Sequence, residues 1–239
     1  MRYAELIDAI RVQGAALRES ALRAGPDVPV ATCPDWRVHD LIAHLGGVHD
    51  FILQATRGEQ PTFERSSGSW TDVVDRWDRV FGALLQRMSN AHADEQVWTP
   101  PGTPPVLRSW ARRAAHETAI HRLDADSAVK DLKTLVFGTE FAADGIDEFL
   151  GTLLPATSAR RPSTVAGTVL YHAADAGRVW QLRLDVGKPV VMTEPTGSGV
   201  DADVSVVGTA DAVYRAVWGR PSTAVVTGDR SILAAFTPP

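Results

Sequence analysis

The spacing of the apolar residues changes abruptly along this chain, and that change limits the folds open to it. Up to about residue 155 the apolar residues recur at helical spacing, whereas after residue 164 they alternate at every second position. A helix and a sheet must each bury an apolar side against another element. The sequence therefore predicts an α+β protein, with a helical N-terminal part and a small mixed C-terminal part.

Five helical segments are expected in the N-terminal part. Each carries an apolar stripe, and the third opens with Ser69 and Asp72, which have the spacing of a capping box. The segments cover residues 3–25, 38–58, 69–88, 110–126 and 139–155. Helices of this length, joined by loops, indicate an antiparallel four-helix bundle with one added helix.

The C-terminal part is expected to begin after a linker at 158–164. Alternating patterns predict strands within 164–173, 178–186 and 201–210. Two short helices should follow, at 210–220 with Thr209 as its cap and at 230–236 with Asp229 as its cap. We therefore expect two domains, a helical bundle over 1–157 and a small α+β domain over 162–239.

Composition excludes several classes of protein. The chain of 239 residues has a net charge of −5 and a pI of about 5.8, which disfavours a nucleic-acid partner. Its single cysteine, Cys33, allows no internal disulfide. The apolar runs are too short for a signal peptide or a membrane span. We expect a cytoplasmic protein without a membrane partner, as a monomer or weak homo-oligomer.

The stretch "WARRAAHETAIHRLDAD" places ionisable side chains among alanines. Glu117 and His121 are four residues apart and lie on the same helix face, whereas His116 diverges from His121 by about 140°. Such glutamate–histidine pairs are common on solvated helices. Here small and apolar neighbours indicate at least partial burial, and a buried carboxylate needs a charged partner or a metal.

A third candidate ligand lies on the second helix. His44 falls between Leu41, Leu45 and Val48 on the apolar stripe, where a histidine is usually a hydrogen-bonded core residue. In a bundle it can meet Glu117 and His121 across the core. Two imidazoles and a carboxylate suit zinc among the divalent metals, and three protein ligands leave a position open for catalysis.

The motifs "CPDWRVHDLIAHLGG" and "HETAIHRLDAD" resemble those of the mycothiol-dependent maleylpyruvate isomerase family of actinobacteria. "AADGIDEFL" and "VWGR…VTGDRSIL" resemble it as well. The resemblance covers nearly the whole chain and implies a DinB-like metal-binding bundle followed by a sterol-carrier-like domain. It implies metal ligands at His44, Glu117 and His121. One departure is Arg37, which follows Trp36 where the family has a threonine or serine cap, so Thr32 or Asp35 is expected to cap the second helix.

The resemblance further implies two cofactors, a divalent metal and the thiol mycothiol. A metal with an open position can bind a thiol and lower its pKa, and the thiolate then attacks a small electrophilic substrate. The reaction would be that of an isomerase or an S-transferase. Two alternatives remain at this point: a non-catalytic metal- or small-molecule-binding stress-response protein of the DinB-like class, and a member that holds no metal.

Other residues receive narrower expectations. Asp124, three residues after His121, is a candidate to orient an imidazole, or else a surface acid. Arg220 matches the segment in which the family is thought to carry a catalytic arginine, although a helix-terminal surface position is an equal alternative. We expect one C-terminal arginine to face the metal cavity, the candidates being Arg178, Arg183, Arg215, Arg220 and Arg230. The residues expected not to bind the metal are His39, His49, His116, His172 and Cys33, with His39 and His49 on the surface.

Overall fold

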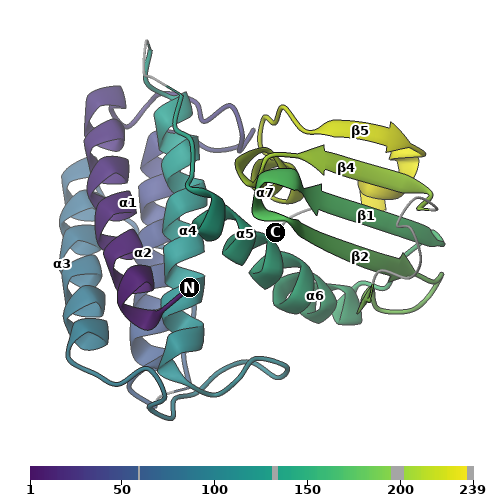
Figure 1. Cartoon of the computed structure of the whole chain (residues 1–239). Coiled ribbons are helices and arrows are strands. Elements are labelled where there is room, and N and C mark those ends of the chain that lie inside the picture. The colour runs from purple at the N-terminus through teal and green to yellow at the C-terminus, as the bar shows by residue number, and fades with distance from the viewer. Residues whose placement is uncertain (59, 131–133, 195–201, 236–239) are drawn as a thin grey trace. The chain divides into compact units, whose positions relative to one another are not determined.

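The computed structural model describes residues 1–58, 60–130, 134–194 and 202–235. The chain forms two compact units, residues 1–135 and 136–239, shown in Figure 1. No helix in the described ranges is both long enough and apolar enough to cross a membrane. The α+β class expected from the sequence is confirmed, since the first unit is helical and the second contains a mixed sheet.

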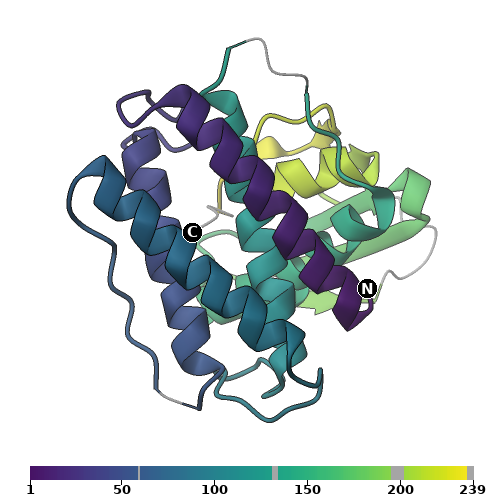
Figure 2. The same cartoon turned by 90° about the vertical axis from the view of Figure 1, so that its left-hand side faces the viewer.

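The first unit is a bundle of four helices. They are α1 (Tyr3–Ala24), α2 (Val38–Ala55), α3 (Trp70–Ser89) and α4 (Leu107–Ser127). Helix α1 packs against α4, α2 packs against α3, and α2 also contacts α4. In Figure 2, α1 and α3 lie side by side in the foreground, with α2 and α4 behind them. The pairing of α2 with α4 matters most, because these two helices carry the candidate ligands.

The helix starts show where local sequence decides structure. Ser69 and Asp72 form the predicted capping box of α3: the Ser69 amide donates to Asp72 Oδ2 at 3.0 Å, and Ser69 Oγ accepts from the Asp72 amide at 3.3 Å. The cap expected for α2 is wrong. Asp40 Oδ2 accepts from the Arg37 amide at 3.0 Å, whereas Thr32 donates to Asp124 on α4.

The second unit contains a five-stranded sheet in the order β3-β2-β1-β4-β5. Its strands are β1 (Gly167–Ala173), β2 (Arg178–Leu184), β3 (Val191–Thr193), β4 (Val204–Gly208) and β5 (Val225–Gly228). Strand β1 pairs with β4 in parallel, and the other neighbouring strands pair antiparallel. The sequence pattern predicted β1, β2 and β4 but missed the edge strands β3 and β5, whose three and four residues are too few to give a clear alternating pattern.

In the second unit the helical run that begins at Thr139 extends further than the expected end at residue 155, whereas the helix expected at 210–220 ends at Val217. The helices and helical turns of this unit are α5 (Thr139–Glu148), a π-helical turn η1 (Phe149–Leu153), α6 (Leu154–Arg160), α7 (Ala210–Val217) and the short 3-10 turns η2 (Ala174–Ala176) and η3 (Arg230–Ala235). Pro155 does not end the helical run: it lies in the first turn of α6, directly after the π-helical turn η1. Thr209 caps α7 as predicted, accepting from the Ala212 amide.

The boundary between the two compact units lies earlier in the chain than the boundary expected from the sequence. Helix α5 packs against α7, so the second unit begins at Val136, and the expected boundary between residues 157 and 162 lies inside it. A helical stripe shows that a face must be buried but not which element covers it. The final residue of the helix expected at 230–236 lies outside the described residues.

Candidate metal centre

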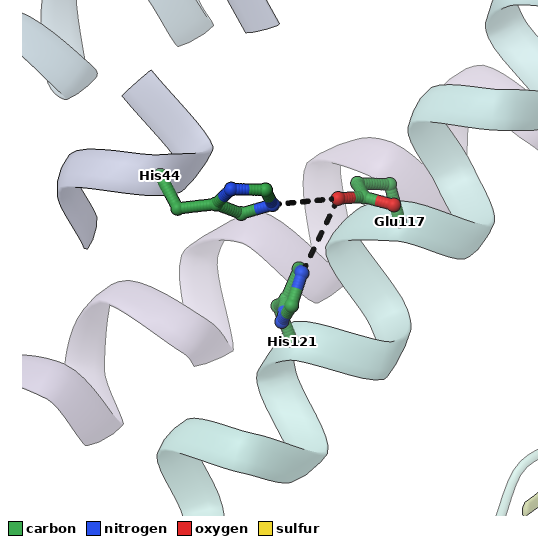
Figure 3. A group of neighbouring side chains, drawn as sticks. All are labelled: His44, Glu117 and His121. Carbon is green, nitrogen blue, oxygen red and sulfur yellow. Dashed lines mark hydrogen bonds and ion pairs between the residues drawn. The ribbon is translucent and has the colours of Figure 1, made fainter. Parts of the chain in front are cut away.

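Three side chains from α2 and α4 converge in the first unit. His44 projects from α2, and Glu117 and His121 project from successive turns of α4, as Figure 3 shows. Glu117 Oε1 lies 3.1 Å from His44 Nε2 and 3.2 Å from His121 Nε2. Within the described ranges this is the one group of three or more potential ligands whose donor atoms lie within 4.8 Å of one another. The structure thus brings together the three residues singled out in the sequence.

Helix α4 holds this arrangement through a row of charged neighbours. Arg113, one turn before Glu117, donates to Glu117 Oε2 at 3.3 Å, so the other oxygen, Oε1, faces the two imidazoles. Three residues after His121, Asp124 Oδ2 accepts from His121 Nδ1 at 2.8 Å, which leaves Nε2 directed at Glu117. Sequence reasoning missed Arg113, although its i−4 spacing from Glu117 was a usable signal.

Asp124 is a buried carboxylate with several donors. It is fully buried, which rules out the surface-acid alternative. Besides His121, it accepts from Thr32 Oγ1 at 2.5 Å and from the Cys33 thiol at 3.6 Å. Both donors belong to the loop between α1 and α2, so Asp124 connects that loop to the imidazole of His121.

Electrostatics favour a negatively charged Glu117 and a positively charged His121. Burial would raise the pKa of Glu117, but the hydrogen bond and charge of His121, with His44 and Arg113, hold it well below its usual range. Burial would lower the pKa of His121, but hydrogen bonds to Asp124 and Glu117 outweigh it and raise that pKa to about 9. A positive charge at this position is therefore stabilised, and a bound divalent cation can take the place of the proton.

Aromatic side chains border the three convergent residues. The Trp36 ring centre lies 4.8 Å from that of His44 and 5.9 Å from that of His121. The Phe63 ring lies 5.9 Å from His44. The guanidinium of Arg65 stacks over Trp36 at 4.6 Å from its ring centre. Sequence analysis did not identify Phe63 or Arg65, because they come from the loop before α3 and show no periodic pattern.

The other histidines occupy different environments. The expected surface position of His49 is wrong, because the residue is fully buried between α2, α3 and α4. Its Nδ1 accepts from Trp77 Nε1 at 3.1 Å, and its Nε2 lies 3.0 Å from Thr118 Oγ1. His116 is also buried, and His39 bonds the carbonyl of Gly68. His172 lies on β1 in the second unit.

Arg220 belongs to the second unit. It follows α7, and its Nη1 donates to the carbonyl oxygen of Trp218 at 2.6 Å. The side chain is half-buried rather than fully exposed.

Comparison with known proteins identifies the family. Residues 7–126 match the family model for the mycothiol maleylpyruvate isomerase N-terminal domain, and residues 140–235 match the MDMPI C-terminal domain. No curated protein matches the chain by sequence.

Solved structures agree on the fold. A crystal structure of the mycothiol-dependent maleylpyruvate isomerase is 12% identical, with a TM-score of 0.61, over 95% of this chain and 93% of the other. A histidine-to-alanine mutant of that isomerase gives a TM-score of 0.63 at the same identity and coverage. Sterol carrier protein 2 from Yarrowia lipolytica gives a TM-score of only 0.26, too low to support an argument about the second unit. On the matches of both family models, the chain belongs to the mycothiol maleylpyruvate isomerase family.

Proposed function

We propose that this protein is a metal- and mycothiol-dependent enzyme, an isomerase or S-transferase that acts on a small electrophilic substrate. The observation that carries the proposal is the convergence of His44 Nε2, His121 Nε2 and Glu117 Oε1. Family membership supports it, and the solved relatives named as mycothiol-dependent maleylpyruvate isomerases support the isomerase form in particular. Maleylpyruvate is therefore the first substrate to test.

The donor set fits a divalent cation, with zinc as our choice. Two neutral imidazole nitrogens and one carboxylate oxygen are a common set for catalytic zinc. Asp124 suits the role of a supporting residue, because it bonds the nitrogen of His121 that faces away from Glu117. When bound, such a cation supplies a Lewis acid that lowers the pKa of a coordinated thiol, so that thiolate is available at neutral pH.

The chain's own residues would then orient the reactants and exclude water. The three candidate ligands, His44, Glu117 and His121, are together called the triad. The apolar rings of Trp36 and Phe63 border this triad. Arg113 holds Glu117 in place and keeps its charge compensated. Arg220 is proposed as a catalytic residue on the strength of its motif, since an arginine can pair with an acidic group bidentately. No nucleophile from the chain is required, because the thiol comes from the cofactor.

Metal analysis of purified protein tests the proposed metal ligands. We expect close to one zinc per wild-type chain, a large loss of zinc in the His44→Ala and Glu117→Gln variants, and full zinc in His39→Ala, which serves as the matched control. Full metal content in His44→Ala would contradict the proposed ligand set.

Thiol binding and turnover test the proposed activity. We expect metal-loaded protein to bind mycothiol in preference to glutathione and to turn over maleylpyruvate or another electrophile in its presence. Arg220→Met is expected to lower kcat/KM without changing zinc content. Metal and thiol binding without turnover of any electrophile tested would instead favour a non-catalytic binding protein.

A further inference from the structure

A short segment before α3 lies directly against α2 beside His44. The Ser66 amide donates to the carbonyl oxygen of Ala43 at 3.1 Å. A Cβ on Gly46 would approach Ser66 Oγ to 2.5 Å, and a Cβ on Gly47 would approach the Glu64 carbonyl oxygen to 2.6 Å. The glycine pair thus allows close contact between segment 63–66 and the turn of α2 that follows His44.

This contact places two unlike side chains next to the triad. The Phe63 ring lies 5.9 Å from that of His44, yet the residue remains 52% exposed. The Arg65 guanidinium lies 4.6 Å from the Trp36 ring centre, and Trp36 in turn lies 4.8 Å from the ring centre of His44. Arg65 and His44 therefore both lie against the ring of Trp36, which places the guanidinium close to the candidate metal ligands.

Arg65 differs from Arg113, the arginine that is paired with Glu117. Arg113 is mostly buried. Arg65 is exposed, and its one hydrogen bond within the described ranges runs from Nη2 to the Asp40 carbonyl oxygen at 3.3 Å; there it forms no ion pair with a carboxylate. Contact with the Trp36 ring restrains the guanidinium while leaving donors available.

We propose that Arg65, together with Trp36 and Phe63, forms an anion subsite beside the triad that binds a carboxylate group of the electrophilic substrate. The planar fork of arginine matches a carboxylate bidentately, and the two aromatic rings suit a flat, conjugated carbon skeleton. The inference rests on the function proposed above, and it assigns Arg65 as the residue that selects electrophiles with a carboxylate close to the reacting carbon.

Binding of maleate, a small planar dicarboxylate, tests the subsite. Calorimetry would measure the binding of maleate, with its uncharged diamide as control ligand. The proteins titrated would be zinc-loaded wild type and the Arg65→Met, Arg65→Lys and Arg79→Met variants. Arg79 is a matched control because it is exposed on α3 and, among the residues that the structure describes, bonds only the carbonyl oxygen of Asp75 in its own helix. Zinc content would be measured for every variant.

We expect Arg65→Met to weaken maleate binding about 10-fold to 100-fold, the usual loss for a charge-assisted pair. The Arg65→Lys variant should bind maleate with intermediate affinity, and the Arg79→Met variant should bind it as tightly as wild type does. The diamide should bind weakly, and with the same affinity, to all four proteins. Equal maleate affinity in wild type and Arg65→Met, or no saturable binding of maleate to wild type, would overturn the subsite.

Zinc content separates this proposal from the function on which it rests. If wild type binds zinc through His44 but the Arg65→Met variant binds maleate as tightly as wild type, the anion subsite is wrong and the proposed metal centre is retained. If wild type holds no zinc but maleate binding depends on Arg65, the metal-dependent function fails and the anion subsite stands.

Discussion

At the scale of single residues, Asp124 joins the triad to the loop that covers it. Its two oxygens accept from Thr32, Cys33 and His121. The carboxylate therefore orients the His121 ring and also holds the loop that carries Trp36. A supporting residue of this kind acts on metal affinity without touching the metal.

We predict that Asp124→Asn lowers zinc affinity about 10-fold to 100-fold, as is common for the loss of a supporting carboxylate. An amide in this place can still accept from Thr32 but no longer supplies a negative charge behind His121. Chelator competition would measure the affinity.

The control for this change is Asp126→Asn, which removes a carboxylate from the same helix. Asp126 accepts from Ser20 and pairs with Arg122, outside the triad. We expect its zinc affinity to match that of wild type. An Asp124→Asn protein that binds zinc as tightly as wild type would show that His121 is held by packing alone.

At the scale of elements, the glycine pair in α2 decides how closely segment 63–66 approaches. Glycine in a helix normally costs about 1 kcal/mol relative to alanine. At Gly47 that cost is offset by the close packing that the absence of a Cβ allows. A Cβ there would lie 2.6 Å from the backbone oxygen of Glu64 and 3.0 Å from the Phe63 ring. Gly82 on α3 provides the comparison, since nothing lies within 4 Å of its Cβ position.

We predict opposite outcomes for the two glycine-to-alanine changes. Gly82→Ala should stabilise the protein by up to about 1 kcal/mol through helix propensity. Gly47→Ala should destabilise it by about 1 to 2 kcal/mol, because overpacking against the backbone exceeds the gain in propensity. Urea denaturation would measure both. A stabilised Gly47→Ala variant would mean that segment 63–66 is not fixed against α2.

At the scale of the whole molecule, the buried His49 makes stability depend on pH. Burial is the main cause that lowers its pKa to about 4, and the surrounding helices bond it as the neutral ring. In the unfolded chain the pKa returns to about 6.5. Between these two values the unfolded state binds more protons, so stability falls as the pH falls through this window.

We predict that this residue alone removes about 2 kcal/mol of stability on going from neutral pH to about pH 5, and at most about 3 kcal/mol below its folded pKa. The His49→Gln variant should be less stable at neutral pH but should lose less stability on acidification. Urea midpoints of both proteins across this range, with metal removed by a chelator, give the difference. Parallel pH dependence in the two proteins would show that His49 does not titrate on unfolding.

Much of the architecture could be predicted from local sequence. Helical periodicity predicted α1 to α4, and Ser69 and Thr209 were recognised as caps, because these features depend on residues within a few positions of one another. The short edge strands β3 and β5 could not be predicted, because they are defined by their partners rather than by their own pattern. Nor could the packing of α5 on α7, which moves the start of the second unit to Val136.

By itself the sequence determined the residue types of the candidate site and the spacing that sets Glu117 and His121 on one helix face. It could not determine that His49 is buried, because helical angle fixes a direction but not the element that lies there. Only the tertiary structure brought His44 to Glu117, joined Thr32 and Cys33 to Asp124, and set Phe63 and Arg65 beside the site. These contacts join residues far apart in the chain, and the packing of helices and loops against one another decides them.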